Sequence, residues 1–432
     1  MSTFDLIVAG AGPAGLMAAK TAAEEGLKVI ILETKEHISR YTRPCCSMWL
    51  LEPGFHNEGW SFEKDKIFFH RNDFVLNYKG GLIKLYRSVR ISPGGNTLIM
   101  GKRNRPIAMV IDKQALCEGL LNEVDQLNVD IRPRTTALEV KEESDIVQVK
   151  VRHHDKQEWL SGKWLIAADG VNSRITESLG LNQNRKVLIR TQVTHYIYAN
   201  VNSPYEDAWT QFIGFGFNGV SGTMIRKPDQ NGLNRIYEVS ARPPAGSGIS
   251  FGESIQKLVK SDQLQDWFKD AELIRKMGCL WTCFEPIKAP ARKRIILTGD
   301  APSFQEVEIQ GALMCGFRAA KAVKMEMNGE PGMKSYNRFW QDYFEFNDDK
   351  VLQECCRGFS IGNLKNDQID YLFKLAEGKL LDGYINHFIC GNTLINFFYS
   401  QQDRIEKERP DIAETLKVIN RLSPEDAFKD TV

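Results

Sequence analysis

Glycines near the start of the chain have the spacing needed to surround a dinucleotide phosphate group. A glycine-rich hexapeptide follows the apolar run 4–9 and reads Gly10-Ala11-Gly12-Pro13-Ala14-Gly15. Gly10 permits a tight turn, Gly12 lets the backbone approach a pyrophosphate, and Gly15 allows a helix to pack closely. The N-terminus of that helix offers unpaired N–H groups and the positive end of its dipole. The segment therefore predicts a phosphate-binding turn.

The elements around this turn complete a nucleotide-binding pattern. A stretch of helical composition follows the turn, and a second apolar run at 27–32 ends at Glu33 and Thr34. A carboxylate at this place accepts both ribose hydroxyls of an adenosine and disfavours a 2′-phosphate. The order strand, glycine turn, helix, strand and acid predicts a Rossmann-type domain.

Two later turns extend the predicted site. The apolar run 164–168 ends in Ala168-Asp169-Gly170, and the run 296–298 ends in Gly299-Asp300. Asp300 is placed to accept a ribityl hydroxyl. The small-residue helix that includes Gly311 and Ala312 is expected to aim its N-terminal amides at the N1–C2=O edge of a flavin, which gains negative charge on reduction. Three motifs in this order indicate FAD rather than NAD.

A family resemblance follows from these motifs. GAGPAG, AADGVNSRI and TGDA resemble the FAD-dependent oxidoreductases of the aromatic hydroxylase and geranylgeranyl reductase superfamily. The chain is more similar to the geranylgeranyl reductases, through Pro44-Cys45-Cys46 and the small-residue helix 312–320. It has Lys113 where that group has an arginine. The resemblance covers roughly residues 1 to 335.

The resemblance implies a cofactor site and a candidate acid. Cys45 or Cys46 would lie beside the flavin and donate a proton to one alkene carbon while flavin N5 delivers hydride to the other. The alternative is that these thiols only shape the pocket. The expected FAD contacts are Gly10, Gly12, Pro13, Ala14, Gly15, Glu33, Thr34, Cys45, Lys113, Ala137, Ala168, Asp169, Gly170, Gly299, Asp300, Gly311 and Ala312.

One segment departs from the family pattern. The family continues its Gly-Asp with a proline and a run of glycines beside the flavin. This chain instead has the segment 301–311, APSFQEVEIQG, with polar side chains at Gln305, Glu306, Glu308 and Gln310. We expect a remodelled pocket on one side of the flavin.

The remaining sequence predicts an α/β fold with three parts. The FAD-binding domain is expected to comprise 1–65, 100–180 and 290–335. Alternating apolar and polar residues in 66–99 and 181–289 predict an inserted antiparallel β-sheet domain for substrate, with Gly80-Gly81 as a hairpin turn. Residues 336–432 have a helical, aromatic-rich pattern. They are expected to cap the other domains, and the alternative is an apolar face that meets lipid or a partner protein.

Composition narrows the function classes. The chain has 432 residues, 42% of them hydrophobic, and a net charge of +1, so no nucleic-acid partner is expected. No apolar run is long enough to span a membrane, and no secretory signal is seen. The 9 cysteines have no metal-site spacing, so no metal is expected. These features predict a cytoplasmic protein, with the membrane surface as an alternative.

The sequence thus predicts an FAD-dependent oxidoreductase that reduces carbon–carbon double bonds of an apolar, prenyl-like substrate. A second complete glycine turn is absent from the sequence, so the electron donor is expected to be a ferredoxin-like protein, a quinol or transiently bound NAD(P)H. Two alternatives share the FAD motifs. One is a flavin-dependent aromatic monooxygenase, and the other is a flavin electron-transfer subunit that acts with a partner protein.

Overall fold

A mostly parallel sheet is built from strands in 4–32, 130–167 and 291–297. The computed structural model describes residues 4–230, 232–361, 364–388, 390–423 and 426–427. The parallel strands, in their order across the sheet, are β11 (Asp130–Arg132), β2 (Val29–Leu32), β1 (Phe4–Ala9), β14 (Lys156–Ala167) and β21 (Ile295–Leu297). The antiparallel β13 (Val147–His153) and β12 (Thr135–Glu142) extend it, and β20 (Ala291–Arg292) pairs with β21.

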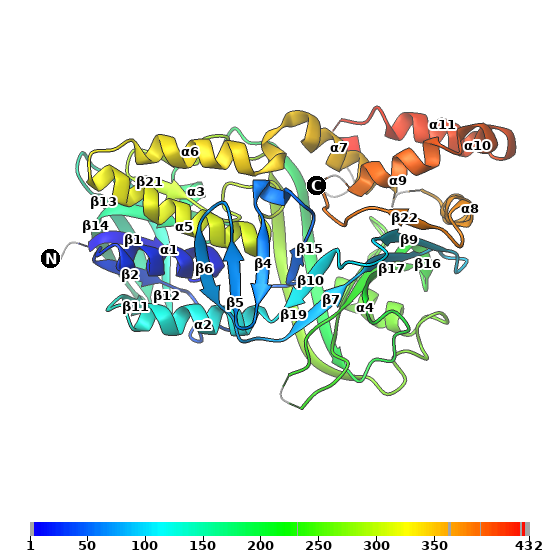
Figure 1. Cartoon of the computed structure of the whole chain (residues 1–432), viewed down its shortest axis with the longest axis horizontal. Helices are drawn as coiled ribbons and strands as arrows, with labels where there is room; N and C mark the ends of the chain where they lie inside the picture. The colour runs from blue at the N-terminus through cyan, green and yellow to red at the C-terminus, as the bar shows by residue number, and fades with distance from the viewer. Residues whose placement is uncertain (1–3, 231, 362–363, 389, 424–425, 428–432) are drawn as a thin grey trace.

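Helices cover this sheet because its central strands are apolar on both faces. All four residues of β2 are buried, as expected for a parallel strand between helical layers. The neighbouring helices are α1 (Pro13–Glu24), α2 (Lys113–Asp125) and α5 (Glu308–Met327), and α1 contacts both of the others (Figure 1). The short α3 (Arg174–Ser178) follows β14.

A second large sheet stands beside the first. Its order is β19 (Glu272–Phe284), β15 (Val187–Ala199), β18 (Tyr237–Arg242), β17 (Val220–Arg226), β16 (Ala208–Phe217), β8 (Arg87–Ile91), β9 (Thr97–Gly101) and β22 (Leu380–Asp382). Helix α4 (Phe251–Val259) packs on one face, against β15, β17 and β18. The largely antiparallel second sheet expected from the sequence is therefore present, and we refer to it as the substrate sheet after that expectation.

Two small sheets connect the large ones, and they correct the hairpin expected at Gly80-Gly81. One comprises β4 (Trp60–Glu63), β5 (Lys66–Phe69) and β6 (Phe74–Asn77), and the other β3 (Met48–Leu50), β10 (Ala108–Ile111) and β7 (Leu82–Leu85). Strands β6 and β7 thus belong to different sheets. The Tyr78 hydroxyl donates to Gly81 O (2.7 Å) and accepts from Asp112 N (2.8 Å), so the chain crosses toward β10.

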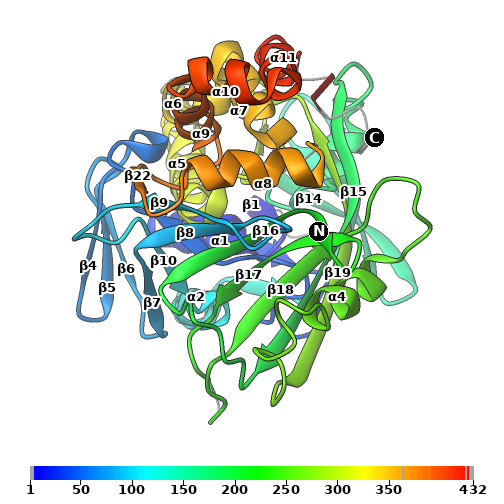
Figure 2. The same ribbon diagram turned by 90° about the vertical axis from the view of Figure 1, so that its right-hand side faces the viewer.

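Helices of the C-terminal region lie over the second face of the substrate sheet (Figure 2), except the first of them, which packs on α5. They are α6 (Gly332–Tyr343), α7 (Asp349–Ser360), α8 (Asn366–Leu375), α9 (Cys390–Tyr399), α10 (Gln402–Glu408) and α11 (Pro410–Ile419). Strand β22 comes from the same region and pairs in parallel with β9. The helical cap is as predicted, whereas the added strand is not.

The observed architecture is the expected α/β fold, with a Rossmann-type sheet, a largely antiparallel second sheet and C-terminal helices. Within the described part of the chain, no helix has both the length and the apolar character needed to cross a bilayer.

Candidate active site

The predicted cofactor residues meet in one cavity of about 430 Å³ at the carboxyl ends of β1, β2, β14 and β21. Ligands in doubly wound sheets bind at this edge. All predicted contacts line the cavity except Gly15, Cys45 and Gly311. The predicted residues that line it are Gly10, Gly12, Pro13, Ala14, Glu33, Thr34, Lys113, Ala137, Ala168, Asp169, Gly170, Gly299, Asp300 and Ala312.

The glycine turn has the geometry that a phosphate needs. Gly10 has φ +100°, and a Cβ there would lie 2.3 Å from Ala168 O. A Cβ on Gly15 would lie 1.9 Å from Gly10 O, so Gly15 serves the contact between helix and strand. A Cβ on Gly12 would meet nothing within 4 Å, and no side chain caps α1. The first N–H groups of α1 are therefore available to an anion.

Glu33 is held at the end of β2 by the backbone around it. Its Oε2 accepts from Ala11 N (2.9 Å), and its Oε1 accepts from Lys35 N (2.9 Å) and from the Thr34 hydroxyl (2.9 Å). Oε2, with one donor, keeps acceptor capacity. Glu33 is thus oriented for ribose hydroxyls, and Thr34 helps to orient it.

The two aspartates of the Gly-Asp turns lie deeper in the protein. Asp300 Oδ1 accepts from Val307 N (3.0 Å), and Asp169 Oδ2 accepts from Ile175 N (3.2 Å). Burial raises the pKa of both carboxyls. Asp169 Oδ1 is buried without a hydrogen-bond partner in the described structure. Such an atom is expected where a ligand hydroxyl completes the site.

Cations in the cavity balance the charge of a diphosphate. Besides Lys113, the side chains of Lys35, Arg43 and Arg174 line the space. The sequence interpretation did not include these three residues. Arg43 directly precedes the Pro44-Cys45-Cys46 segment, but arginine and lysine in loops have no diagnostic spacing, so only the folded cavity identifies them.

Cys45 and Cys46 line neither cavity described here, but Cys45 contacts Lys113 of the cofactor cavity, and their segment is held by buried charges. Lys113 Nζ donates to Cys45 Sγ at 3.4 Å. Burial lowers the pKa of Lys113, but Cys45 and other nearby groups raise it by more, so the lysine stays charged. Burial and then Glu238 raise the pKa of Cys46 well above its usual value. Cys46 is therefore a neutral thiol.

Three residues of the second sheet hold the backbone of this segment. Lys227 Nζ donates to Cys46 O (2.9 Å) and Cys45 O (3.3 Å), and Glu238 accepts from Cys45 N (3.3 Å). Glu238 also pairs with Lys227 (3.0 Å) and with His195 Nδ1. Burial acts to raise the pKa of Glu238, but Lys227 and His195 lower it to about 2. We refer to these three residues as the Glu238 triad.

The segment 301–311, which departs from the family pattern, brings carboxyl groups toward Lys113. Burial raises the pKa of Glu306 to about 7, with a further contribution from Asp300. Burial and then Glu306 raise the pKa of Glu308 well above its usual value. Gln305 (φ 57°) and Glu308 (φ 55°) have left-handed backbone conformations. The expected remodelling beside the flavin position is thus a strained loop with acidic side chains.

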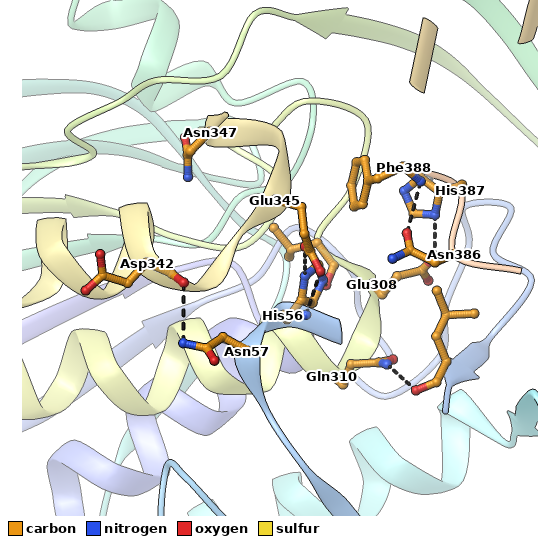
Figure 3. A network of polar contacts seen from close by, with 12 residues as sticks. His56, Asn57, Glu308, Gln310, Asp342, Glu345, Asn347, Asn386, His387 and Phe388 are labelled. Carbon is orange, nitrogen blue, oxygen red and sulfur yellow. Dashed lines mark hydrogen bonds and ion pairs between the residues drawn. The ribbon is translucent and has the colours of Figure 1, made fainter. Parts of the chain in front are cut away.

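His56 secures this loop (Figure 3). Its Nε2 contacts Val307 O (3.1 Å) and its Nδ1 contacts Glu345 Oε2 (2.7 Å), while its backbone N donates to Glu345 Oε1 (2.8 Å). A carbonyl and an ionised carboxylate only accept hydrogen bonds. Burial raises and His56 lowers the pKa of Glu345, and the net shift is downward. Both ring nitrogens therefore lie against acceptor oxygens, and His56 ties the loop backbone at Val307 to Glu345.

A second pair lies on the other side of the loop. His387 Nδ1 is 3.5 Å from Glu308 Oε1, and Gln310 donates to Leu50 O (3.1 Å) near it (Figure 3). Burial and then His56 lower the pKa of His387 to about 4. His387 is thus neutral, and it faces Glu308, whose pKa is raised.

His387 also borders a second cavity of about 430 Å³ between the substrate sheet and the C-terminal helices. Its walls are largely apolar. They include Trp209 and Trp281 from the sheet and Phe373, Leu394 and Phe398 from the helices. The two cavities share no lining residue. This second cavity has the size and apolar lining of a small-molecule site, and we call it the apolar cavity.

The open glycine turn, the oriented Glu33, the unpartnered Asp169 oxygen and the four cations fit FAD, and together they define an FAD-dependent oxidoreductase. The comparisons agree. A family model described as pyridine nucleotide-disulphide oxidoreductase matches residues 4–221. The chain belongs to this family.

Named relatives point in a narrower direction. The chain is 24% identical over 401 residues to the digeranylgeranylglycerophospholipid reductase of Methanocaldococcus jannaschii, covering 88% of this chain and 92% of that one. The structure is similar, with TM-score 0.67 and 18% identity, to a geranylgeranyl bacteriochlorophyll reductase-like protein of Thermoplasma acidophilum, covering 97% and 100% of the chains. The structure is also similar to the flavin-dependent halogenase CmlS, with TM-score 0.59 and 15% identity, covering 97% of this chain and 77% of that one. The predicted resemblance and cofactor are confirmed.

Proposed function

We propose that this oxidoreductase reduces carbon–carbon double bonds in the isoprenoid chain of an apolar substrate. The observation that carries the proposal is the apolar cavity, whose aromatic and aliphatic walls suit a prenyl chain. The similarity to digeranylgeranylglycerophospholipid reductases, which extends over most of both chains, supports the same substrate class.

The residues described above have distinct proposed roles. Reduced FAD supplies the hydride. The glycine turn, Glu33 and the Gly-Asp turns bind and orient the cofactor. Saturating the double bond also needs one proton, and the neutral Cys46 thiol is a candidate donor, since burial raises its pKa. Cys45 lies beside Lys113 and is the alternative donor. The Glu238 triad positions both.

The two large sheets have separate proposed roles. We propose that residues 1–65, 100–180 and 290–335 bind FAD and that 66–99 and 181–289 bind substrate, with 336–432 closing the apolar cavity. A soluble cytoplasmic enzyme that meets its lipid at the membrane surface, with a ferredoxin-like protein, a quinol or NAD(P)H as electron donor, is consistent with this arrangement.

The test is an anaerobic visible-absorbance titration of the FAD-loaded enzyme. We expect dithionite to bleach the flavin and a geranylgeranyl lipid to restore its colour, because the alkene accepts the electrons. The matched control is the fully saturated phytanyl lipid, which should leave the flavin bleached. Mass spectrometry should find two added hydrogens for each double bond reduced.

Other results would replace the proposal. If the alkene does not restore colour but oxygen does, and an aromatic compound speeds reduction by NADPH, the enzyme is an aromatic monooxygenase. If neither lipid nor aromatic compound reacts and the flavin exchanges electrons only with a co-purifying protein, it is an electron-transfer subunit.

A further inference from the structure

Arg90 is a buried cation inside the apolar cavity. It lies on β8, is 6% exposed, and its side chain reaches the cavity lining. Its Nη1 has no hydrogen-bond partner in the described structure. No described carboxylate forms an ion pair with it, and its one described side-chain partner is Cys390, through a hydrogen bond and an electrostatic interaction.

Cys390 does not neutralise this charge. Burial raises the pKa of the Cys390 thiol, so the sulfur is uncharged at neutral pH. Glu52 also acts on Cys390, but it makes no ion pair with Arg90, and burial raises its pKa as well. A guanidinium remains protonated in proteins. Arg90 is therefore a charge with no counter-ion among the described residues, an arrangement that is costly unless a ligand supplies the anion.

The whole cavity has the same electrostatic character. Arg242 is a second guanidinium in its lining, and its Nε donates to the Ser221 hydroxyl (3.2 Å) rather than to a carboxylate. The lining residues that the structure describes include no aspartate or glutamate. The sheet face around Arg90 also carries neutral hydrogen-bonding side chains, namely Gln211, Thr223 and Ser240. A cavity that is apolar on its helical wall and cationic on its sheet wall is complementary to an anionic amphiphile.

We propose that the apolar cavity binds an isoprenoid lipid with a phosphate group, and that Arg90 is the residue that holds the phosphate. The guanidinium presents paired N–H donors that match phosphate oxygens. The helical wall, with Phe373, Leu394 and Phe398, then contacts the hydrocarbon chain. Two sources carry this chemistry, a prenyl phosphate and a prenylated glycerophospholipid. The inference rests on the proposed function, which identifies the hydrocarbon chain of the lipid as isoprenoid.

The experiment measures binding to the oxidised, FAD-loaded enzyme without turnover. Trp209 and Trp281 line the cavity, so quenching of tryptophan fluorescence reports occupancy, and calorimetry checks the affinity. The probes are geranylgeranyl phosphate, a digeranylgeranyl glycerophospholipid and the uncharged alcohol geranylgeraniol. For the wild-type protein we expect at least one phosphate lipid to bind about tenfold or more tightly than the alcohol, since a charged hydrogen bond is lost with the alcohol.

The Arg90→Gln variant should lose this preference and keep the affinity for the alcohol. Arg90→Lys should retain part of it. The matched control is Arg87→Gln on the same strand, because Arg87 pairs with Asp207 (2.8 Å) and does not line the cavity. That variant should discriminate like the wild type. Flavin content and circular dichroism identify any variant that misfolds. If Arg90→Gln misfolds, the preference of Arg90→Lys for phosphate lipid over alcohol decides instead.

Two results would overturn the assignment. One is equal binding of phosphate lipids and alcohol by the wild-type protein. The other is an unchanged preference in Arg90→Gln. Whichever phosphate lipid binds more tightly, geranylgeranyl phosphate or the digeranylgeranyl glycerophospholipid, identifies the source of the phosphate. Failure of the proposed function is distinguishable, because an enzyme that keeps the Arg90-dependent preference but never reduces the alkene retains the anion site and lacks only the proposed reaction.

Discussion

At the scale of single residues, Glu238 has the largest expected effect on the candidate site. It is 2% exposed and contacts both Lys227 and His195, which come from other parts of the same sheet. All three groups are removed from water, so the energetic cost of burying each is offset only while the others are present. The carboxylate also accepts from Cys45 N. One side chain therefore links sheet stability to the position of the candidate acid.

We expect Glu238→Gln to destabilise the protein by about 3–5 kcal/mol, the range for breaking a buried ion pair on one side. The folded pKa of about 2 lies below the ordinary 4.5. Stability from ionised Glu238 is therefore fully present above pH 4.5 and is lost as the pH falls toward 2. Urea unfolding at several pH values should give a difference between wild type and variant that shrinks across this window.

The control is Glu206→Gln. Glu206 pairs with Arg226, but its side chain is 55% exposed, so its removal should change stability by about 1 kcal/mol or less. A Glu238→Gln protein that unfolds like this control would contradict the assigned role of the triad.

At the scale of elements, the packing of α1 on α5 fixes the phosphate-binding turn. A Cβ on Gly316 in α5 would lie 2.1 Å from Ala14 O in α1. Ala14 belongs to the glycine turn and lines the cofactor cavity. Because backbone rather than a flexible side chain occupies that place, an added methyl group must push the helices apart.

Gly316→Ala should therefore destabilise the protein by about 1–3 kcal/mol, as overpacking does, and should weaken FAD binding several-fold. Denaturant unfolding and a flavin titration of the apoprotein measure the two effects. Gly119→Ala in α2 is the matched control, because its Cβ would make an ordinary contact with Asn77 O at 3.5 Å. It should be neutral or stabilising by about 1 kcal/mol, from helix propensity. Equal behaviour of the two variants would refute the close-packing argument.

The sequence predicted those parts of the site whose residues lie close together along the chain. The Gly10 turn and Glu33 belong to one strand–helix–strand unit, so local pattern sufficed. The Glu238 triad joins His195, Lys227 and Glu238 only through pairing of β15, β17 and β18, and no spacing rule anticipates it. Gly80-Gly81 has the composition of a hairpin, yet Tyr78 directs the chain into another sheet. Local glycine patterns do not distinguish these outcomes.

At the scale of the whole molecule, the apolar cavity needs two remote parts of the chain. The substrate sheet supplies one wall, and helices beyond residue 336 supply the other. Strand β22 joins those helices to β9. The apolar cavity and the cofactor cavity are spatially separate, because they share no lining residue. A change in the helical wall should therefore affect lipid without affecting flavin.

Leu394→Trp tests this separation. Leu394 is 5% exposed on α9 and lines the apolar cavity, so the larger side chain should occupy the space that the lipid needs. We expect lipid affinity to fall about tenfold or more, while the flavin spectrum and FAD affinity stay unchanged. Leu416→Trp in α11 is the control for overpacking alone, since Leu416 is equally buried at 5% but does not line the cavity. It should lower stability by about 1–3 kcal/mol and leave lipid affinity intact. If Leu394→Trp binds geranylgeranyl lipid as tightly as the wild type, the lipid site lies elsewhere, and the C-terminal helices serve only to stabilise the substrate sheet.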